Sequence, residues 1–288
     1  MFDIETYLNS LPENTTEIDV ARQDITYINV TRFKKLKILH CEYNRLTSLH
    51  LNENLEELYC YNNRLTSLQL NEKLEKLYCS NNELTSLRLN ENLKTLYCNN
   101  NKLSSLRPLE KLQILSCCDN KLSSLHLNEK IEQLYCNRNR LTSLQLNAKL
   151  ESLDCNHNQL TSLHLNTNLQ YLSCYNNRLT SLHSNKNLKY LFCTHNRLTS
   201  LHLNENIVYL FCSNNPISEI IGDTVAIKQV KILNNFRYLY YSLKFKKRFR
   251  DLLWVKIREP KIREKYSHDY LVENLHEDTD LDDLLENW

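Results

Sequence analysis

Cysteine is the residue whose type and spacing in this chain could support chemistry. Ten of the 11 cysteines recur at intervals of 19 residues. They are Cys41, Cys60, Cys79, Cys98, Cys117, Cys136, Cys155, Cys174, Cys193 and Cys212. Such a row could form disulfides, bind metal ions or supply a nucleophile, or it could fill a core, because a free thiol packs like a small apolar side chain.

The spacing favours the core. The chain has no C-x-x-C pair, and nearby histidines such as His157 and His195 fall past the end of a short strand. A disulfide at one step of an even row would leave the next thiol unpaired. We therefore predict no metal, no cofactor and no catalytic residue in the row. Cys118, which stands outside it, should point away from the core and be the reactive thiol.

The composition is that of an ordinary water-soluble protein. Of 288 residues, 41% are apolar and 24% are charged, with 36 basic and 34 acidic side chains. The opening MFDIETYLNSLPEN lacks a basic start and an apolar run, and no window approaches 18 uncharged apolar residues. We expect no secretion signal, no membrane span and a cytoplasmic location. No Ser/His/Asp grouping or phosphate loop indicates an enzyme or a small-molecule substrate.

The cysteines belong to a longer repeat. The copies follow the frame L-x-x-L-x-C-x-x-N-x-L-[TS]-S-L, and its asparagine is present in all ten, from Asn44 to Asn215. Self-similarity at a fixed period of this length indicates a solenoid in which each repeat forms one coil. A degenerate earlier copy, TTEIDVARQDITYI, brings the expected array to about 11 coils.

This frame resembles the leucine-rich repeat, whose consensus L-x-x-L-x-L-x-x-N-x-L is met here with cysteine at the third apolar site. The resemblance covers about residues 15–222. It implies a leucine-rich-repeat solenoid with a curved parallel β-sheet on the concave face and a mostly extended, turn-rich convex face.

Alternation within each repeat predicts which side chains face the core. In LYCYN, Leu58 and Cys60 should point inward, and Tyr59 and Tyr61 outward. Each repeat asparagine should bond buried backbone groups of its own coil and the next one. Because the chain has a single glycine, Gly222, asparagine should also serve at turns with unusual backbone angles.

Function in such a solenoid falls to the outward strand positions, because packing occupies the inward ones. Many of these positions are aromatic, in one group in the early coils and a denser one in the late coils. We predict that they bind a protein partner, since aromatic side chains dominate interface hot spots. The predicted partner-binding residues are Tyr59, Tyr61, Tyr78, Tyr97, Tyr135, Tyr171, Tyr175, Tyr190, Phe192, Tyr209 and Phe211.

Other interpretations of the array stay open. Neighbouring rings could stack on one another and serve only stability. A basic row beside the asparagines, which includes Arg45, Lys102 and Arg140, could be a solvated edge or could meet phosphate, although nucleic acid is the less favoured partner. Bacterial leucine-rich repeat proteins of similar build carry a catalytic cysteine domain behind the array, but here Cys212 belongs to the row. A role as adaptor for ubiquitin-ligase-type machinery remains an alternative.

The two ends differ from the repeat. FDIETYLNSL predicts a short amphipathic helix that Asp3 caps and Pro12 ends, so residues 1–14 should form an N-terminal helical cap before the array at 15–222. Residues 223–288 predict an α-helical C-terminal module, whose basic first part precedes an acidic one. We expect this module to cap the array; contact of its basic helix with nucleic acid or an anionic surface is the alternative.

The tail WVKIREPKIREKYSHDYLVENLHEDTDLDDLLENW and the glycine-poor, asparagine-rich repeats also resemble proteins of giant, mimivirus-like DNA viruses that infect amoebae. This resemblance implies an uncharacterised viral protein that acts in the host cytoplasm or is packed in the virion.

Overall fold

The computed structural model describes residues 2–217 and Lys246. A short helix, α1 (Ile4–Ser10), precedes a series of strands of three residues each. Apart from Lys246, the C-terminal module predicted at residues 223–288 lies outside the described residues. The same holds for the last residues of the predicted array, after Ile217.

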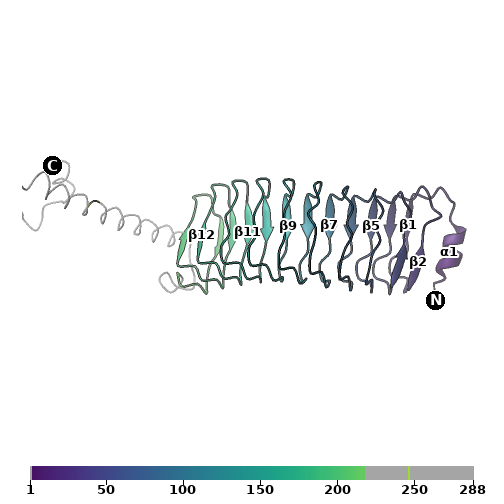
Figure 1. Cartoon of the computed structure of the whole chain (residues 1–288), viewed down its shortest axis with the longest axis horizontal. Coiled ribbons are helices and arrows are strands. Elements are labelled where there is room, and N and C mark those ends of the chain that lie inside the picture. The colour runs from purple at the N-terminus through teal and green to yellow at the C-terminus, as the bar shows by residue number, and fades with distance from the viewer. Residues whose placement is uncertain (1, 218–245, 247–288) are drawn as a thin grey trace, which may run out of the picture. The chain divides into compact units, whose positions relative to one another are not determined.

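Eleven strands form one parallel sheet with one strand from each coil, and Figure 1 shows them side by side. Each residue pairs with its equivalent one repeat later, as Leu58 does with Leu77. The predicted parallel solenoid is therefore confirmed. The strands in sheet order are β1 (Glu17–Asp19), β3 (Ile38–His40), β5 (Glu57–Tyr59), β6 (Lys76–Tyr78), β7 (Thr95–Tyr97), β8 (Ile114–Ser116), β9 (Gln133–Tyr135), β10 (Ser152–Asp154), β11 (Tyr171–Ser173), β13 (Tyr190–Phe192) and β15 (Tyr209–Phe211).

The chain between these strands is mostly extended or turning. It forms two small parallel pairs in the described part, β2 (Tyr27–Asn29) with β4 (Ser48–His50) and β12 (Ser181–His183) with β14 (Ser200–His202). The predicted extended, turn-rich segments are therefore present. A repeat of this length leaves too few residues for an ordinary helix in each coil.

The core consists of leucine and sulphur. The central leucine of a typical sheet strand is buried, and so is the cysteine that follows it, as with Leu58 and Cys60 at 0% exposure. All ten cysteines of the row are buried, and all 11 are free thiols. The prediction that the row fills the core is confirmed.

A turn with left-handed backbone follows each cysteine of the row. The second residue after the cysteine has φ between 49° and 56°, a conformation that asparagine tolerates better than other residues with a side chain. Half of the ten positions hold asparagine, as predicted for a chain so poor in glycine. The other five are Tyr43, Asp119, Arg138, His157 and His195.

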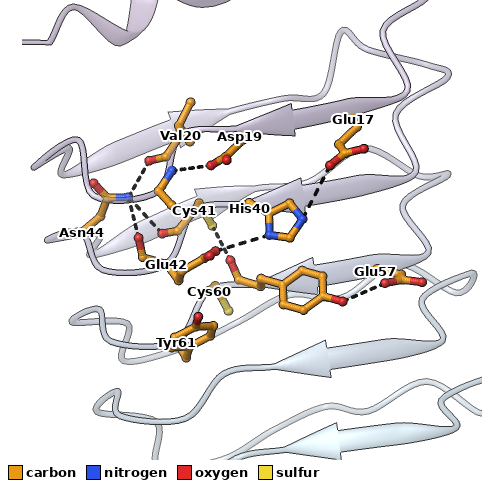
Figure 2. A network of polar contacts seen from close by, with 12 residues as sticks. Glu17, Asp19, Val20, His40, Cys41, Glu42, Asn44, Glu57, Cys60 and Tyr61 are labelled. Atoms are coloured by element: carbon orange, nitrogen blue, oxygen red, sulfur yellow. Dashed lines mark hydrogen bonds and ion pairs between the residues drawn. The ribbon is translucent and has the colours of Figure 1, made fainter.

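The repeat asparagine joins each coil to the one before it. The side-chain nitrogen of Asn63 donates to the carbonyl oxygens of Cys60 (3.1 Å) and Cys41 (3.0 Å), and its oxygen accepts from the backbone nitrogen of Leu46 (2.9 Å). Figure 2 shows the Asn44 amide directed at carbonyls in the same way. The predicted role is confirmed but its direction was wrong: the partner is the preceding coil, because the side chain turns back under the strand end.

A second asparagine ladder, which the sequence frame did not reveal, lies a few residues before the strands of the 11-stranded sheet. Asn147, for example, donates to the carbonyls of Asn128 (2.6 Å) and Ile131 (3.0 Å) and accepts from the backbone nitrogen of Leu150 (2.8 Å). Leu109 interrupts this ladder, and an open pocket of about 360 Å³ lies there. The ladder members are Asn52, Asn71, Asn90, Asn128, Asn147, Asn166, Asn185 and Asn204.

The predicted N-terminal helix is present. The Asp3 carboxylate accepts from the backbone nitrogens of Glu5 (3.1 Å) and Thr6 (3.3 Å), which is the expected capping geometry. Leu8 is buried, and its carbonyl accepts a hydrogen bond from the Arg32 guanidinium. The helix is therefore bonded to the first coils of the array.

Candidate functional site

The outward surface of the 11-stranded sheet, called the sheet face below, carries most of the residues predicted to bind a partner. The central residue of a strand is buried and the two flanking ones point outward, as Glu57 and Tyr59 do around Leu58. Parallel pairing repeats each position every coil, at about 4.8 Å. Equivalent side chains therefore form columns across the sheet face.

Four rings of the early coils form a continuous stack, called the early stack. His40, Tyr59, Tyr78 and Tyr97 end the strands β3, β5, β6 and β7. Consecutive ring centroids lie 4.4, 4.5 and 5.1 Å apart, with planes within 17° of parallel. All four residues are half-buried. Because these rings cover one another, the interpretation of stacking for stability fits them best.

Carboxylates flank the first ring of the early stack (Figure 2). The Nε2 of His40 lies 3.8 Å from Glu17, and its Nδ1 lies 3.7 Å from Glu42. One oxygen of the Glu42 carboxylate is buried without a hydrogen-bond partner. The His40 ring therefore lies between two acids.

A hydrogen bond also fixes the second ring of the early stack. The Tyr59 hydroxyl donates to the Glu57 carboxylate at 2.9 Å, and Lys76 forms an ion pair of 2.8 Å with the same group. The hydrogen bond from Lys76 is the main cause that lowers the pKa of Glu57. Burial, followed by the bond to Glu57, raises the pKa of Tyr59. The phenol thus stays neutral and serves as a donor.

The late coils carry a more exposed group of rings, called the late cluster. Tyr190 stacks on Tyr209 at 5.5 Å and Phe192 on Phe211 at 5.2 Å, while Tyr171 contacts Tyr190 and Phe192 at 6.2 and 5.6 Å. Three members remain exposed: Tyr190 at 38%, Tyr209 at 53% and Phe211 at 52%. The structure thus gathers five of the six late-coil residues predicted to bind a partner in two adjacent columns of the sheet face, and Tyr175 is the one that these ring contacts leave out.

The other three predicted residues belong to neither group. Tyr61 meets Tyr43 edge to face at 5.3 Å, and Tyr175 meets His157 in the same manner at 5.1 Å. The Tyr135 hydroxyl donates to the side chain of Gln133 at 3.3 Å in its own strand. Each of these rings is half-buried, and Tyr135 and Tyr175 are near enough to Tyr171 to contribute to its raised pKa.

Polar residues that the sequence frame did not single out occupy the middle of the sheet face. The Asn99 side-chain oxygen accepts from the Ser116 hydroxyl at 2.8 Å, and three coils later Asn156 accepts from Ser173 at 2.9 Å. Both serines are buried. Asp154 lies half-buried between the two pairs. An asparagine followed 17 residues later by serine is the signal that could have identified the pairs.

The thiols are poorly suited to chemistry. Burial raises the pKa of the row cysteines, and it raises the pKa of the half-buried Cys118 to about 11. Cys118 is the one thiol that is not fully buried, as predicted, and its reactivity stays a prediction, which the raised pKa makes slow. Among the residues described, no group of three or more His, Cys, Asp or Glu side chains is arranged to hold a metal ion.

Part of the basic row is neutralised by acids one coil earlier. Lys102 pairs with Glu83 at 3.0 Å, and Arg45 pairs with Asp24 at 2.5 Å. These pairs are solvent-exposed and fit the interpretation of a solvated edge.

The comparisons with known proteins concern the repeats. A family model of leucine-rich repeats, in two copies, matches residues 72–111. YopM from Yersinia enterocolitica is similar in structure, with a TM-score of 0.65 and 28% identity over 74% of this chain. The functional domain of InlJ from Listeria monocytogenes, which includes a cysteine ladder, gives 0.61 and 28% over 75%. The array is a parallel β-solenoid similar in fold to these leucine-rich repeat proteins.

A further similar structure is YopM from Yersinia pestis, described as a leucine-rich effector protein, with a TM-score of 0.59 and 26% identity over 69% of this chain and 61% of that one. The chain spans about half of the first two structures, 49% and 47% of their lengths. No curated protein matches it. The expected resemblance to viral proteins finds no support in these matches.

Leucine-rich repeat solenoids typically serve as interaction scaffolds without catalytic activity. Nothing in the described geometry shows catalysis. Among the residues that the structure describes, no helix combines the length and the apolar character that crossing a bilayer requires.

Proposed function

We propose that this leucine-rich repeat solenoid is a non-enzymatic module that binds a protein partner through the late cluster. Exposure is the observation that carries the proposal. The rings of Tyr190, Tyr209 and Phe211 stack on neighbours and yet keep between 38% and 53% of their surface in contact with water. Val208 beside them is 56% exposed. Clustered exposed apolar side chains of this kind mark interaction sites.

The scaffold under these rings favours binding. Each ring projects from a strand that is hydrogen-bonded to its neighbours in register, with Tyr190 opposite Tyr209 and Phe192 opposite Phe211. Stacked rings already have restricted side-chain rotation. Covering them with a partner therefore costs little additional conformational entropy. The early stack lacks this exposure, and we assign it to stability.

The similar structures support an interaction role of this kind. YopM of Yersinia pestis is described as an effector, and its likeness to this chain lies in the repeats. These structures do not identify the partner, which has to be found by experiments on this protein.

The test is capture by the full chain and by the double variant Tyr190→Ala with Phe211→Ala. We expect the variant to lose capture of a partner from a cell lysate while its denaturation midpoint changes little. The matched control is Tyr59→Ala with Tyr78→Ala, which should retain capture.

Capture should also depend weakly on salt, because the late cluster holds its partner by apolar contact. Capture that falls steeply with salt and is unaffected by the late-cluster variant would assign binding to the basic residues instead and refute the proposal.

A further inference from the structure

Two hydroxyl groups of the late cluster point to the chemistry of its partner. The exposed rings of Tyr190 and Tyr209 stack at 5.5 Å with planes 10° apart. Within the part of the chain that the structure describes, neither phenol oxygen forms a hydrogen bond, whereas the hydroxyls of Tyr59 and Tyr135 donate within their own strands. A donor buried without an acceptor opposes binding. A partner that covers the late cluster therefore has to supply acceptors for both hydroxyls.

The outward strand positions of the late cluster are uncharged. Over β11, β13 and β15 one column holds Tyr171, Tyr190 and Tyr209, and the other holds Ser173, Phe192 and Phe211. A charged side chain placed on this surface would lose hydration without gaining a counter-charge. The surface therefore suits a segment whose contacting side chains are uncharged.

The spacing of the coils selects the backbone conformation of that segment. Tyr171 and Tyr209 occupy equivalent positions two coils apart in register, which corresponds to about 9.6 Å, twice the strand spacing. A polyproline II helix repeats every three residues, or about 9.3 Å, and its carbonyl oxygens are free because it has no internal hydrogen bonds. An α-helix bonds its carbonyls internally. An extended strand repeats at about 6.6 Å, which fits neither one coil nor two.

The border of the late cluster carries acids on one side. Burial, and to a smaller extent the charge of Asp154 on the preceding strand, raises the pKa of Tyr171. Glu151 is exposed just before the same preceding strand, β10. A basic residue at this end of a bound segment would lie near both acids. One exposed ion pair adds little affinity, so binding would still depend weakly on salt.

We propose that the late cluster binds a proline-rich segment of the partner in the polyproline II conformation, laid across β11, β13 and β15 with a basic residue at the β10 end. Residues i and i+3 of the segment contact Tyr171 and Tyr209, and its carbonyl oxygens accept from the hydroxyls of Tyr190 and Tyr209. Proline suits this surface because it brings no backbone N–H to be buried and holds the segment in shape before binding. This inference rests on the proposed function, since it names the kind of partner that the late cluster takes.

The test is isothermal titration calorimetry of the full chain with a blocked peptide of nine prolines and one arginine, placed at the amino end in one version and at the carboxyl end in the other. We expect saturable binding of at least one version, and none of a peptide in which alternating glycine and serine replace the prolines. Glutamate in place of the arginine should weaken binding about threefold.

The decisive variant is Tyr190→Phe with Tyr209→Phe, which keeps both rings and removes both hydroxyls. It should weaken binding of the proline peptide about tenfold, the loss of two hydrogen bonds. The matched control, Tyr59→Phe with Tyr78→Phe in the early stack, should bind the peptide as tightly as wild type does.

Three results would overturn the inference. One is no saturable binding of either proline peptide. Another is equal affinity of wild type and the variant Tyr190→Phe with Tyr209→Phe. The third is tighter binding of the glutamate peptides than of the arginine peptides. If the proline peptides fail to bind while Tyr190→Ala with Phe211→Ala still loses capture from lysate, the inference fails and the proposed function stands, with a partner of another kind such as an amphipathic helix.

Discussion

The side-chain amide of Asn139 donates a hydrogen bond of 2.9 Å to the carbonyl oxygen of Cys117, one coil earlier. It also donates to Cys136 in its own coil, and its oxygen accepts from the backbone of Leu122. Asn139→Ala should leave these buried groups unpaired and lower the free energy of unfolding by about 2–4 kcal/mol. Urea denaturation measures this, with the exposed Ser143→Ala as control. A loss below about 0.5 kcal/mol would show that the ladder does not hold the coils together.

Arg138 adopts a φ of 53°, where equivalent coils such as that of Asn100 hold asparagine. A residue with an ordinary side chain loses roughly 1–2 kcal/mol in this conformation, and asparagine tolerates it better. Arg138→Asn should therefore stabilise the protein by about 0.5–1 kcal/mol, and the reverse change, Asn100→Arg, should destabilise it by a similar amount. Chemical denaturation of both variants checks the pair. A stability gain from Asn100→Arg would contradict the assignment.

The row of buried thiols should resist modification. Burial raises the pKa of Cys118 to about 11, so about one molecule in a thousand carries the thiolate at pH 8. A disulfide reagent should label at most one thiol slowly in the native protein and all 11 after denaturation. Cys118→Ser should abolish the slow native labelling. Rapid labelling of several native thiols would contradict the buried row.

Replacing Asp154 should change how the free energy of unfolding depends on pH. Its folded pKa is raised, chiefly by burial, so its contribution to stability is fully present below about pH 3.8 and is lost as the pH rises through the folded pKa. His157 and Cys118 face the same carboxyl and stay unchanged in the variant. Asp154→Ser should therefore stabilise the protein more at pH 7.5 than at pH 4. Equal effects at the two pH values would mean that burial of the charge has no cost.

Much of the fold follows from the repeat. Alternation placed Leu58 and Cys60 in the core, where the structure has them. The direction of the Asn63 bonds could not be predicted, because the repeat looks the same toward either neighbour. The second ladder, which includes Asn147, was missed because the frame ended before it.

The candidate site could be predicted only in outline. The outward aromatic positions were recognisable, but their exposure depends on how neighbouring rings turn. Tyr59 and Tyr78 cover each other almost face to face at 4.5 Å, whereas Tyr209 and Phe211 remain more than half exposed. Asp154 looked like one more polar outward residue, and only the structure places it beside the Asn–Ser pairs and in a hydrogen bond with the Asn156 backbone.

The most direct measurement of the central claim compares the two aromatic groups in one experiment. Partner affinity and denaturation midpoint should be measured for Tyr59→Ala with Tyr78→Ala and for Tyr190→Ala with Phe211→Ala. The account predicts that the early-stack variant loses stability, by about 1–2 kcal/mol from lost ring contacts, and keeps its affinity. The late-cluster variant should keep its stability and lose at least tenfold in affinity. The reverse outcome, in which the early-stack variant alone loses affinity, would contradict it.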